Sequence, residues 1–293
     1  MKPFASLLVP LDGSRAAAES LGCAAWLAEQ LTAELHVINA TRDELPPREA
    51  LERLKVPEEV RPRVILHQAA EYPEKAVVEA IEQHEAELVV MTARGAAVES
   101  GESRPQPPNL LGHVARSVAE RSSVPVLLIP PRYRERLPWT SILVPISGEF
   151  EADEALALAV RLANALGLRV LVAHVVGAED EGLAATVRYA DAPHHEYPNR
   201  LEELVSRLLP ECTPEECACI EDVLLCRGDP GELLFKLAGE RQVSVLVMGW
   251  HARFARGHSN VVKQVLTALD CPVLLVKAAP PAPFKLSVGE EIE

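Results

Sequence analysis

Cysteine and histidine side chains gather in the second half of the chain, where they offer metal or redox chemistry. Cys212, Cys217, Cys219 and Cys226 follow the pair His194–His195. Their spacing matches no standard zinc or iron–sulfur pattern. Cys219 and Cys226 fall on one predicted strand, seven residues and therefore about 23 Å apart. We predict no metal ligand, although a metal or redox site formed by Cys212, Cys217 and one of the histidines stays open as an alternative.

Catalytic signatures are absent from the sequence. It contains no nucleophile elbow, no zinc-protease helix motif, no P-loop and no full dinucleotide-binding fingerprint. The abundant carboxylates fall mostly at helical surface spacing, as do Glu79, Glu82 and Glu85. We therefore predict that the chain is not an enzyme, and slow ATP hydrolysis would have no obvious general base.

The elements that position any site come from a duplication. LLVPLDGS from Leu7 recurs as ILVPISGE, LVVM from Leu88 recurs as VLVM, and VPVLLIP from Val124 recurs as CPVLLVK. The offsets are 135, 157 and 147 residues, so the two copies differ in the lengths of their connections. Repetition of this kind predicts two units of the same fold, which we call half 1 and half 2.

Each half alternates short apolar runs with helical periodicity, the pattern of βαβ units and a parallel sheet. Ser14 stands where a helix N-cap belongs, and Gly167 stands where a left-handed residue ends a helix. Strands are expected near 5–10, 34–40, 63–68, 87–91, 125–130, 141–146, 169–176, 219–226, 244–248 and 272–277. Helices are expected near 15–31, 48–56, 74–85, 112–122, 152–166, 198–209, 231–241 and 259–269.

The domain boundaries follow from the repeat. We expect domain 1 over 1–132, an exposed linker over 133–140, domain 2 over 141–278 and a flexible tail over 279–293. Proline and charged residues support the linker and the tail. Two long connections, 96–111 and 177–197, have roles that the sequence leaves open.

Charge and hydropathy exclude several classes of function. The net charge of −14 repels nucleic acid phosphates and anionic lipid, so we expect neither partner. No apolar stretch reaches 18 residues, which excludes a membrane-spanning helix. The first residues do not resemble an export signal, so the six cysteines are expected to be reduced thiols in the cytoplasm.

The motif order VP-x-D-G-S, LVVM-x-x-RG, G-x-x-A and PVLL, repeated in the second half, resembles the universal stress protein family, in which tandem two-domain members are common. The resemblance covers about 3–131 and 139–278. It implies an α/β fold with two tandem open parallel five-stranded sheets, each in the order 3-2-1-4-5, with helices on both faces. Ligands of such sheets bind beyond the carboxyl ends of the strands where the order reverses, here between the first and fourth strands.

The resemblance also implies that the chain binds an adenine nucleotide, either ATP or a related one. Mg²⁺ is a candidate cofactor alongside it. ATP-binding members carry G-x2-G-x9-G-S/T after the fourth strand, where glycines admit the phosphates and helix amides hold them. An aspartate after the first strand contacts the ribose side. Half 1 keeps Asp12, Gly95 and Gly112, whereas Thr92 replaces the first glycine and His113 replaces the hydroxyl residue.

Half 2 departs further from this pattern, because Ser147 replaces the aspartate and Ala252 replaces the second glycine. We therefore predict nucleotide binding in half 1, with half 2 as a dimerisation partner. The candidate nucleotide-binding residues are Pro10, Asp12, Gly13, Ser14, Thr92, Arg94, Gly95, Gly112, His113, Gly249, Ser259 and Asn260.

The fifth strand of each half is an exposed edge that must be paired or covered. We expect the two PVLL strands to face each other within the chain as a pseudo-twofold unit, and two chains to form a homodimer. The expected function is a cytoplasmic stress-response or regulatory protein. An interaction scaffold that binds an unidentified protein and no nucleotide is the alternative.

Overall fold

The computed structural model describes residues 3–94, 111–130, 133, 136–146, 150–176, 212–254, 260–268 and 270–277. Half 1 contains β1 (Ser6–Pro10), α1 (Arg15–Leu31), β2 (Glu34–Ala40), α2 (Pro47–Arg53), the 3-10 turn η1 (Arg61–Arg63), β3 (Val64–Ala69), α3 (Pro73–Gln83), β4 (Leu88–Thr92), α4 (His113–Arg121) and β5 (Val126–Ile129).

Half 2 repeats this succession. It contains β6 (Ser141–Ile146), α5 (Phe150–Leu166), β7 (Arg169–Val176), α7 (Pro214–Cys217), β8 (Ile220–Arg227), α8 (Pro230–Glu240), β9 (Val245–Gly249), α9 (Asn260–Ala268) and β10 (Val273–Val276). The predicted strands and helices that fall within the described residues are confirmed, with ends shifted by a few residues at most. The predicted helix 198–209, the connection 177–197 and the tail 279–293 lie outside the described residues.

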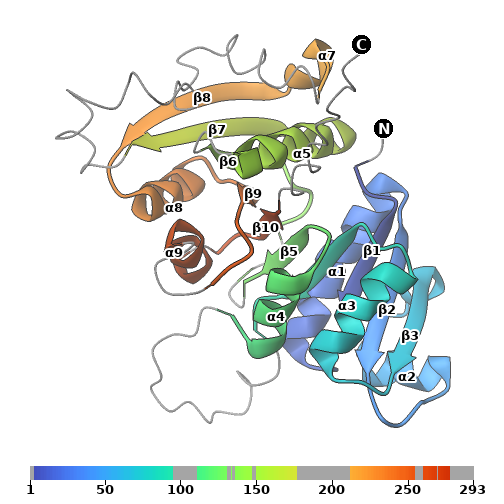
Figure 1. The fold of residues 1–293 in the computed structure, drawn as a ribbon. Coiled ribbons are helices and arrows are strands. Elements are labelled where there is room, and N and C mark those ends of the chain that lie inside the picture. Colours follow the sequence, from blue (N-terminus) through green and yellow to red (C-terminus); the bar gives the residue numbers. More distant parts are fainter. Residues whose placement is uncertain are drawn as a thin grey trace, which may run out of the picture.

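The strands form one sheet with the order β3-β2-β1-β4-β5-β10-β9-β6-β7-β8 (Figure 1). The α/β class and the order 3-2-1-4-5 within each half are confirmed. The prediction of two separate sheets is wrong, because β5 pairs antiparallel with β10 and joins the halves. The pairing satisfies backbone groups that either edge strand would otherwise expose. The expectation that the two PVLL strands face each other is thereby confirmed.

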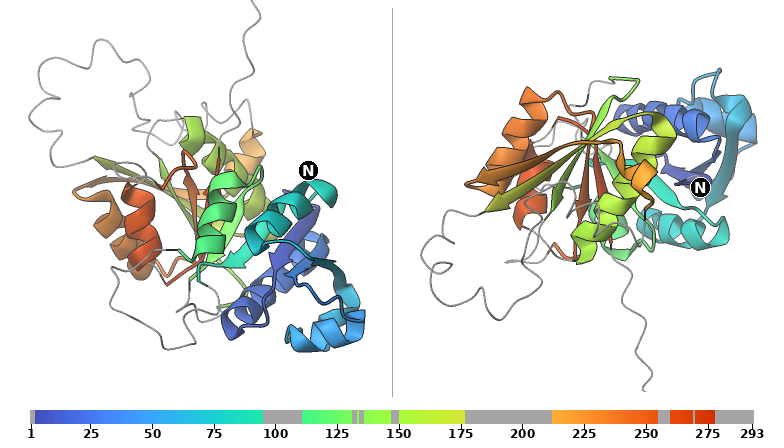
Figure 2. Two further views of the ribbon diagram at one scale, coloured as in Figure 1. Left: turned by 60° about the horizontal axis from the view of Figure 1, so that its bottom comes forward. Right: turned by 90° about the horizontal axis from the view of Figure 1, so that it is seen from above.

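Helices cover both faces of this sheet. Buried residues of α1 and α5 share one core cluster, and those of α3, α4, α8 and α9 share another. Adjacent residues of β1 alternate between the faces, with Leu7 in the first cluster and Leu8 in the second. Burial on both faces explains why the strands are almost uniformly apolar. The two views of Figure 2 show the strands fanning out in one twisted sheet between these helices.

Helix ends have the same geometry in both halves. The residue after α1 is Thr32, with φ 51°, and its counterpart after α5 is Gly167, with φ 68°. The predicted left-handed glycine is therefore confirmed. In each case the next residue donates its N–H back to the helix, over 2.8 Å from Ala33 to Ala28 and 2.9 Å from Leu168 to Ala163. The repeat thus extends to single hydrogen bonds.

Side chains near the β5–β10 pair add polar contacts between the halves. Lys277 Nζ donates to the carbonyls of Glu120 and Ser122, at 2.7 and 2.8 Å, where α4 ends. Burial lowers the pKa of Lys277 to about 8, and the charge of Glu120 opposes this shift. The amine therefore contacts the negative end of the α4 dipole.

The connection between the halves is only partly exposed. Trp139 is buried, and its ring centroid lies 5.2 Å from that of Trp26 on α1. The predicted exposed linker is therefore corrected at this residue, because a large indole gains more by packing against α1 than by remaining in water. No helix among the described residues has the length and apolar character needed to cross a membrane.

Candidate functional site

The strand order reverses at β1, which lies between β2 and β4. Leu7 and Leu8 of β1 stand beside Leu88 and Val89 of β4 in parallel register. Both strands therefore present their carboxyl ends at the same edge of the sheet. The loops that follow them meet there, at the kind of position where open α/β sheets bind ligands.

The loop after β1 is held by its own backbone and by β2. The carbonyl of Leu11 accepts a 2.8 Å hydrogen bond from Asn39 Nδ2. The Asp12 side chain is exposed, and its Oδ1 accepts the Ser14 N–H over 2.9 Å. Gly13 adopts φ 80°, and a Cβ there would lie 3.3 Å from the carbonyl oxygen of Arg53. The loop therefore presents a carboxylate on a backbone that requires glycine next to it.

Ser14 begins α1 as predicted. Its Oγ accepts the Ala17 N–H over 3.1 Å, and the residue is 5% exposed. This hydroxyl is thus engaged by the helix, which it caps. Pro10 ends β1 and is half-buried beside this loop.

The side chain of Thr92 stabilises the turn after β4. This threonine stands where the nucleotide-binding motif has its first glycine. Its Oγ1 donates to the Arg94 carbonyl over 2.8 Å and accepts the Arg94 N–H over 3.3 Å. The buried threonine therefore shapes the turn, and Arg94 is half-buried at its end. Gly95 and most of the 96–111 connection lie outside the described residues.

The start of α4 is tied to the same loop. Gly112 donates its N–H to the Ala93 carbonyl over 2.8 Å and occupies the N-cap in an extended conformation, without a side-chain cap. His113 follows as the first helical residue and is exposed. The structure thus brings the predicted residues 92–94 and 112–113 together, with a positively polarised helix end among them.

The matching loop of half 2 is used differently. Trp250 takes the place of Ala93, and its N–H donates to Val276 just as that of Ala93 donates to Ile129. Its side chain is 3% exposed and contacts Phe254, with ring centroids 4.6 Å apart.

The same loop touches half 1, because the N–H of Phe254 donates to Glu120 Oε1 over 3.0 Å. The loop after β9 is therefore part of the contact between the halves. Of the predicted half-2 residues, Gly249 ends β9 and Asn260 begins α9, while Ser259 lies outside the described residues, as does Ser147.

The cysteines around α7 are packed as core residues. Cys212 and Cys217 are buried, and Cys219 is half-buried against α5, where its Sγ lies 3.6 Å from Asn164 Nδ2. Burial raises the pKa of Cys217, and raises that of Cys219 to about 11 with help from Cys217. The Cys217 and Cys219 thiols are therefore protonated at neutral pH. His194–His195 lies outside the described residues.

A different cluster brings three metal-binding side chains together. Among the described residues, the three side chains able to share one ion are His36, His67 and His84, with ligand nitrogens within 4.8 Å of one another. These histidines were not predicted as a cluster, because 31 and 17 residues separate them along the chain. One feature of the sequence could have indicated the cluster. His36 lies in an apolar strand, and the matching residue of half 2 is Leu171.

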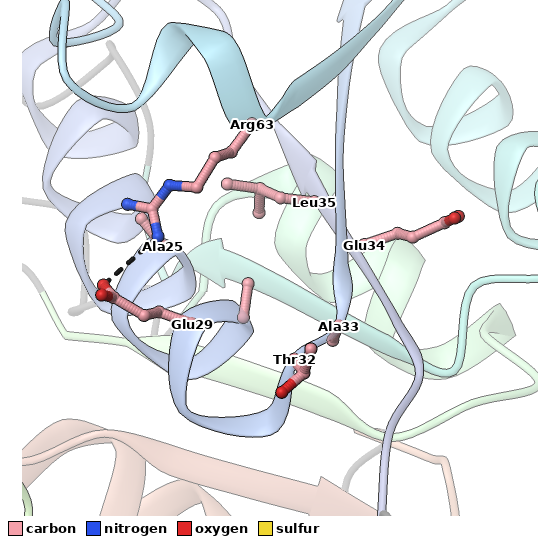
Figure 3. Close-up of a pocket in the computed structure, with 8 residues that line it drawn as sticks. Ala25, Glu29, Thr32, Ala33, Glu34, Leu35 and Arg63 are labelled. Carbon is pink, nitrogen blue, oxygen red and sulfur yellow. Dashed lines mark hydrogen bonds and ion pairs between the residues drawn. The ribbon is translucent and has the colours of Figure 1, made fainter.

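A shallow cavity of about 330 Å³ opens near the amino end of β2, at the end of α1 (Figure 3). An ion pair of 3.2 Å between Arg63 Nη1 and Glu29 Oε2 lies across it. Glu34 points away from the other labelled side chains (Figure 3). This end of the sheet is opposite to the loops of Asp12 and Thr92, so the cavity contains none of the predicted site residues.

Comparison with known proteins identifies the relatives of this fold. A model of the universal stress protein family matches residues 40–130 and 138–277. A functionally unknown protein from Pseudomonas aeruginosa PAO1 is similar in structure, at 17% identity and a TM-score of 0.61, over 94% of this chain and 92% of that one. A universal stress protein from Archaeoglobus fulgidus DSM 4304 is similar at 16% identity and a TM-score of 0.57, over 94% of this chain and 97% of that one. No curated protein matches the chain.

Proposed function

The chain belongs to the universal stress protein family, and from that premise we propose that it is a stress-response protein that binds an adenine nucleotide in half 1. One observation carries the proposal. The 2.8 Å hydrogen bond from the Gly112 N–H to the Ala93 carbonyl holds the start of α4 beside the loop that follows β4. Strand β4 is next to β1, and Asp12 lies in the loop that follows β1. A helix N-terminus attracts phosphate, and an exposed carboxylate accepts hydrogen bonds from ribose hydroxyls.

Each described candidate residue of half 1 has a role in this proposal. Asp12 binds the ribose, and Gly13 lets the backbone turn beneath it. Arg94 and His113 add positive charge or hydrogen-bond donors near the phosphates, whereas Ser14 and Thr92 position the loops through their own hydrogen bonds. Pro10 and Gly112 contribute backbone shape. A Mg²⁺ ion arriving with a triphosphate would be held mainly by phosphate oxygens and water.

Half 2 is proposed as a structural partner without a nucleotide. The loop after β9 packs against half 1. Its Trp250 and Phe254 are buried, and the N–H of Phe254 donates a hydrogen bond to Glu120. Serine at position 147 also removes the carboxylate that half 1 has at Asp12. These features argue against a second site built on Gly249, Ser259 and Asn260.

Isothermal titration of the full chain with ATP, ADP and AMP, with and without Mg²⁺, tests the proposal. We expect one nucleotide per chain. Asp12→Asn keeps an oxygen that can accept the Ser14 N–H, so it removes the charge and leaves the turn intact. Loss of a charged hydrogen bond should weaken binding by about 10- to 100-fold. Ser147→Ala, at the matching place in half 2, should bind normally. Absence of binding at millimolar nucleotide, or an Asp12→Asn variant that binds as wild type, would overturn the proposal.

An interaction scaffold is the second candidate, favoured by large exposed apolar side chains. Tyr72 is 72% exposed, Phe235 49% and Ile65 43%. Because β5 and β10 are paired within the chain, a homodimer would use another surface, such as the outer strands β3 and β8. Light scattering of the purified chain measures whether it dimerises. A dimer that binds no nucleotide would favour the scaffold, and in either case we propose no enzymatic reaction and a cytoplasmic location.

A further inference from the structure

Three histidines from three different elements meet on the face of half 1 that α3 covers. His36 lies on β2, His67 on β3, and His84 is the C-cap of α3. One ring nitrogen of each lies within 4.8 Å of the others. His36 is 6% exposed, and the other two are half-buried.

A carboxylate orients the most buried of these rings. Glu34 Oε2 lies 3.3 Å from His36 Nε2, which favours a proton on Nε2 and leaves the Nδ1 lone pair free to face His67. A histidine ligand of a metal ion characteristically donates its other N–H to such a carboxylate. Glu34 therefore stands where the outer hydrogen-bond acceptor of a histidine ligand would lie.

The distances between the rings are close to those of a metal site. His36 Nδ1 and His67 Nε2 are 2.9 Å apart and share one proton. Two nitrogens bound to one tetrahedral zinc ion would be about 3.3 Å apart, given zinc–nitrogen bonds of ~2.0–2.1 Å. A small separation of the two rings thus lets a metal ion replace the shared proton.

His84 completes the set after a rotation. Its ring is stacked on that of His67, with centroids 3.6 Å apart and an angle of 16° between the planes. Stacked rings direct their lone pairs into parallel planes, so the His84 ring must turn for both to reach one ion. His84 is the C-cap of α3 and is half-buried, so its ring is the one that would turn.

Half 2 provides an internal comparison, because it has the same fold without these histidines. The counterparts are Leu171 on β7, Leu224 on β8 and Arg241 after α8. The residues after the two C-caps, Glu85 and Gln242, both have φ 49°, so α3 and α8 end in a similar backbone conformation. The fold therefore does not need imidazoles here, and burying them is costlier than burying leucine.

We propose that His36, His67 and His84 bind one divalent transition-metal ion, with the fourth position open to water or an incoming ligand. Three imidazoles suit zinc, copper and nickel better than magnesium or calcium. Burial and the neighbouring histidines lower the pKa of His67 to about 4, and burial and His36 also lower the pKa of His84. The ion would connect β2, β3 and α3 at the outer edge of the sheet.

This site is separate from the proposed nucleotide site. His84 precedes β4, at the amino end of that strand, whereas the loops of Asp12 and Thr92 lie at the carboxyl ends. Failure of one proposal therefore leaves the other standing.

Cobalt and zinc titrations of the full chain, first stripped with a chelator, test the proposal. We expect one equivalent of Co²⁺ to produce the intense visible absorption of a four-coordinate ion, and one equivalent of Zn²⁺ to abolish it. His67→Leu and His84→Arg, which copy half 2, should each weaken binding by at least about 100-fold. Zinc should raise the melting temperature of the wild type and not of these variants.

Other histidines serve as controls. His251→Ala and the double variant His194→Ala/His195→Ala should bind as wild type. Circular dichroism would establish that each variant is folded. Absence of both the cobalt spectrum and the zinc-induced stabilisation in the wild type would overturn the proposal. So would full binding by folded His67→Leu, or loss of binding in the His194/His195 variant, which would move the site there.

Discussion

Leu127 of β5 and Leu274 of β10 lie directly opposite each other in the antiparallel pair that joins the two halves. They are also equivalent residues of the repeat, at an offset of 147. A pseudo-twofold axis therefore passes between them, perpendicular to the sheet. The carboxyl ends of the two sets of strands consequently face opposite ways, and a ligand site in one half is remote from its counterpart in the other.

The β5–β10 pair that joins the halves should be a main source of stability. Leu274 is 1% exposed, and Leu274→Ala leaves a cavity there, for which we expect a loss of about 2–5 kcal/mol. Urea unfolding followed by circular dichroism measures this loss. Phe235→Ala, at a residue 49% exposed, is the control and should change stability by less than about 0.5 kcal/mol. Equal losses of stability from the two substitutions would contradict the stabilising role of the β5–β10 pair.

Thr32 holds a backbone conformation that suits glycine. Thr32→Gly should stabilise the chain by up to about 1 kcal/mol, because φ 51° is strained for a β-branched residue. Gly167→Ala is the reverse change at the matching site, with no atom within 4 Å of the added Cβ, and should cost about 1 kcal/mol. Melting temperatures should therefore shift in opposite directions, and shifts of the same sign would refute the strain argument.

Gly13 should be required for the nucleotide site as well as for stability. Gly13→Ala forces a side chain into φ 80° and against the Arg53 carbonyl, so the Asp12 loop must shift. We expect the titration of ATP to show at least about 10-fold weaker binding, because the ribose acceptor moves with the loop. The folded fraction should be checked by circular dichroism. Wild-type affinity in a folded variant would show that the loop does not contact the nucleotide.

The thiols near α7 should react slowly at neutral pH. The thiolate is the reactive form, and a pKa of about 11 for Cys219 leaves roughly one part in 10,000 ionised at pH 7. Because the pKa is raised, alkylation should accelerate about tenfold per pH unit until pH approaches 11. Mass spectrometry of iodoacetamide-treated protein measures this rate, and the chain unfolded in urea is the control. Rapid modification of folded Cys219 at pH 7 would revive the redox alternative.

Local features of this protein follow from the sequence alone. The N-cap at Ser14 and the left-handed Gly167 were predictable because each acts on backbone groups within a few residues of itself. The succession of strands and helices follows from hydrophobic periodicity, which burial on both faces of the sheet imposes. The strand order within each half followed from the family resemblance, since one sequence cannot reveal which strands pair.

Tertiary structure decided the rest, because the remaining features depend on residues far apart in the chain. The single sheet exists because β5 and β10 pair across 147 residues; the sequence identified them as edge strands that face each other, but it did not predict that their pairing merges the two sheets into one. Parallel register places His67 beside Ile38 on β2, and the end of α3 adds His84, so the histidine cluster depends on packing rather than spacing. The loop of Trp250 likewise became part of the contact between halves only when the sheets joined. Spacing encodes contacts within a turn of the chain, whereas register and packing determine which distant side chains meet.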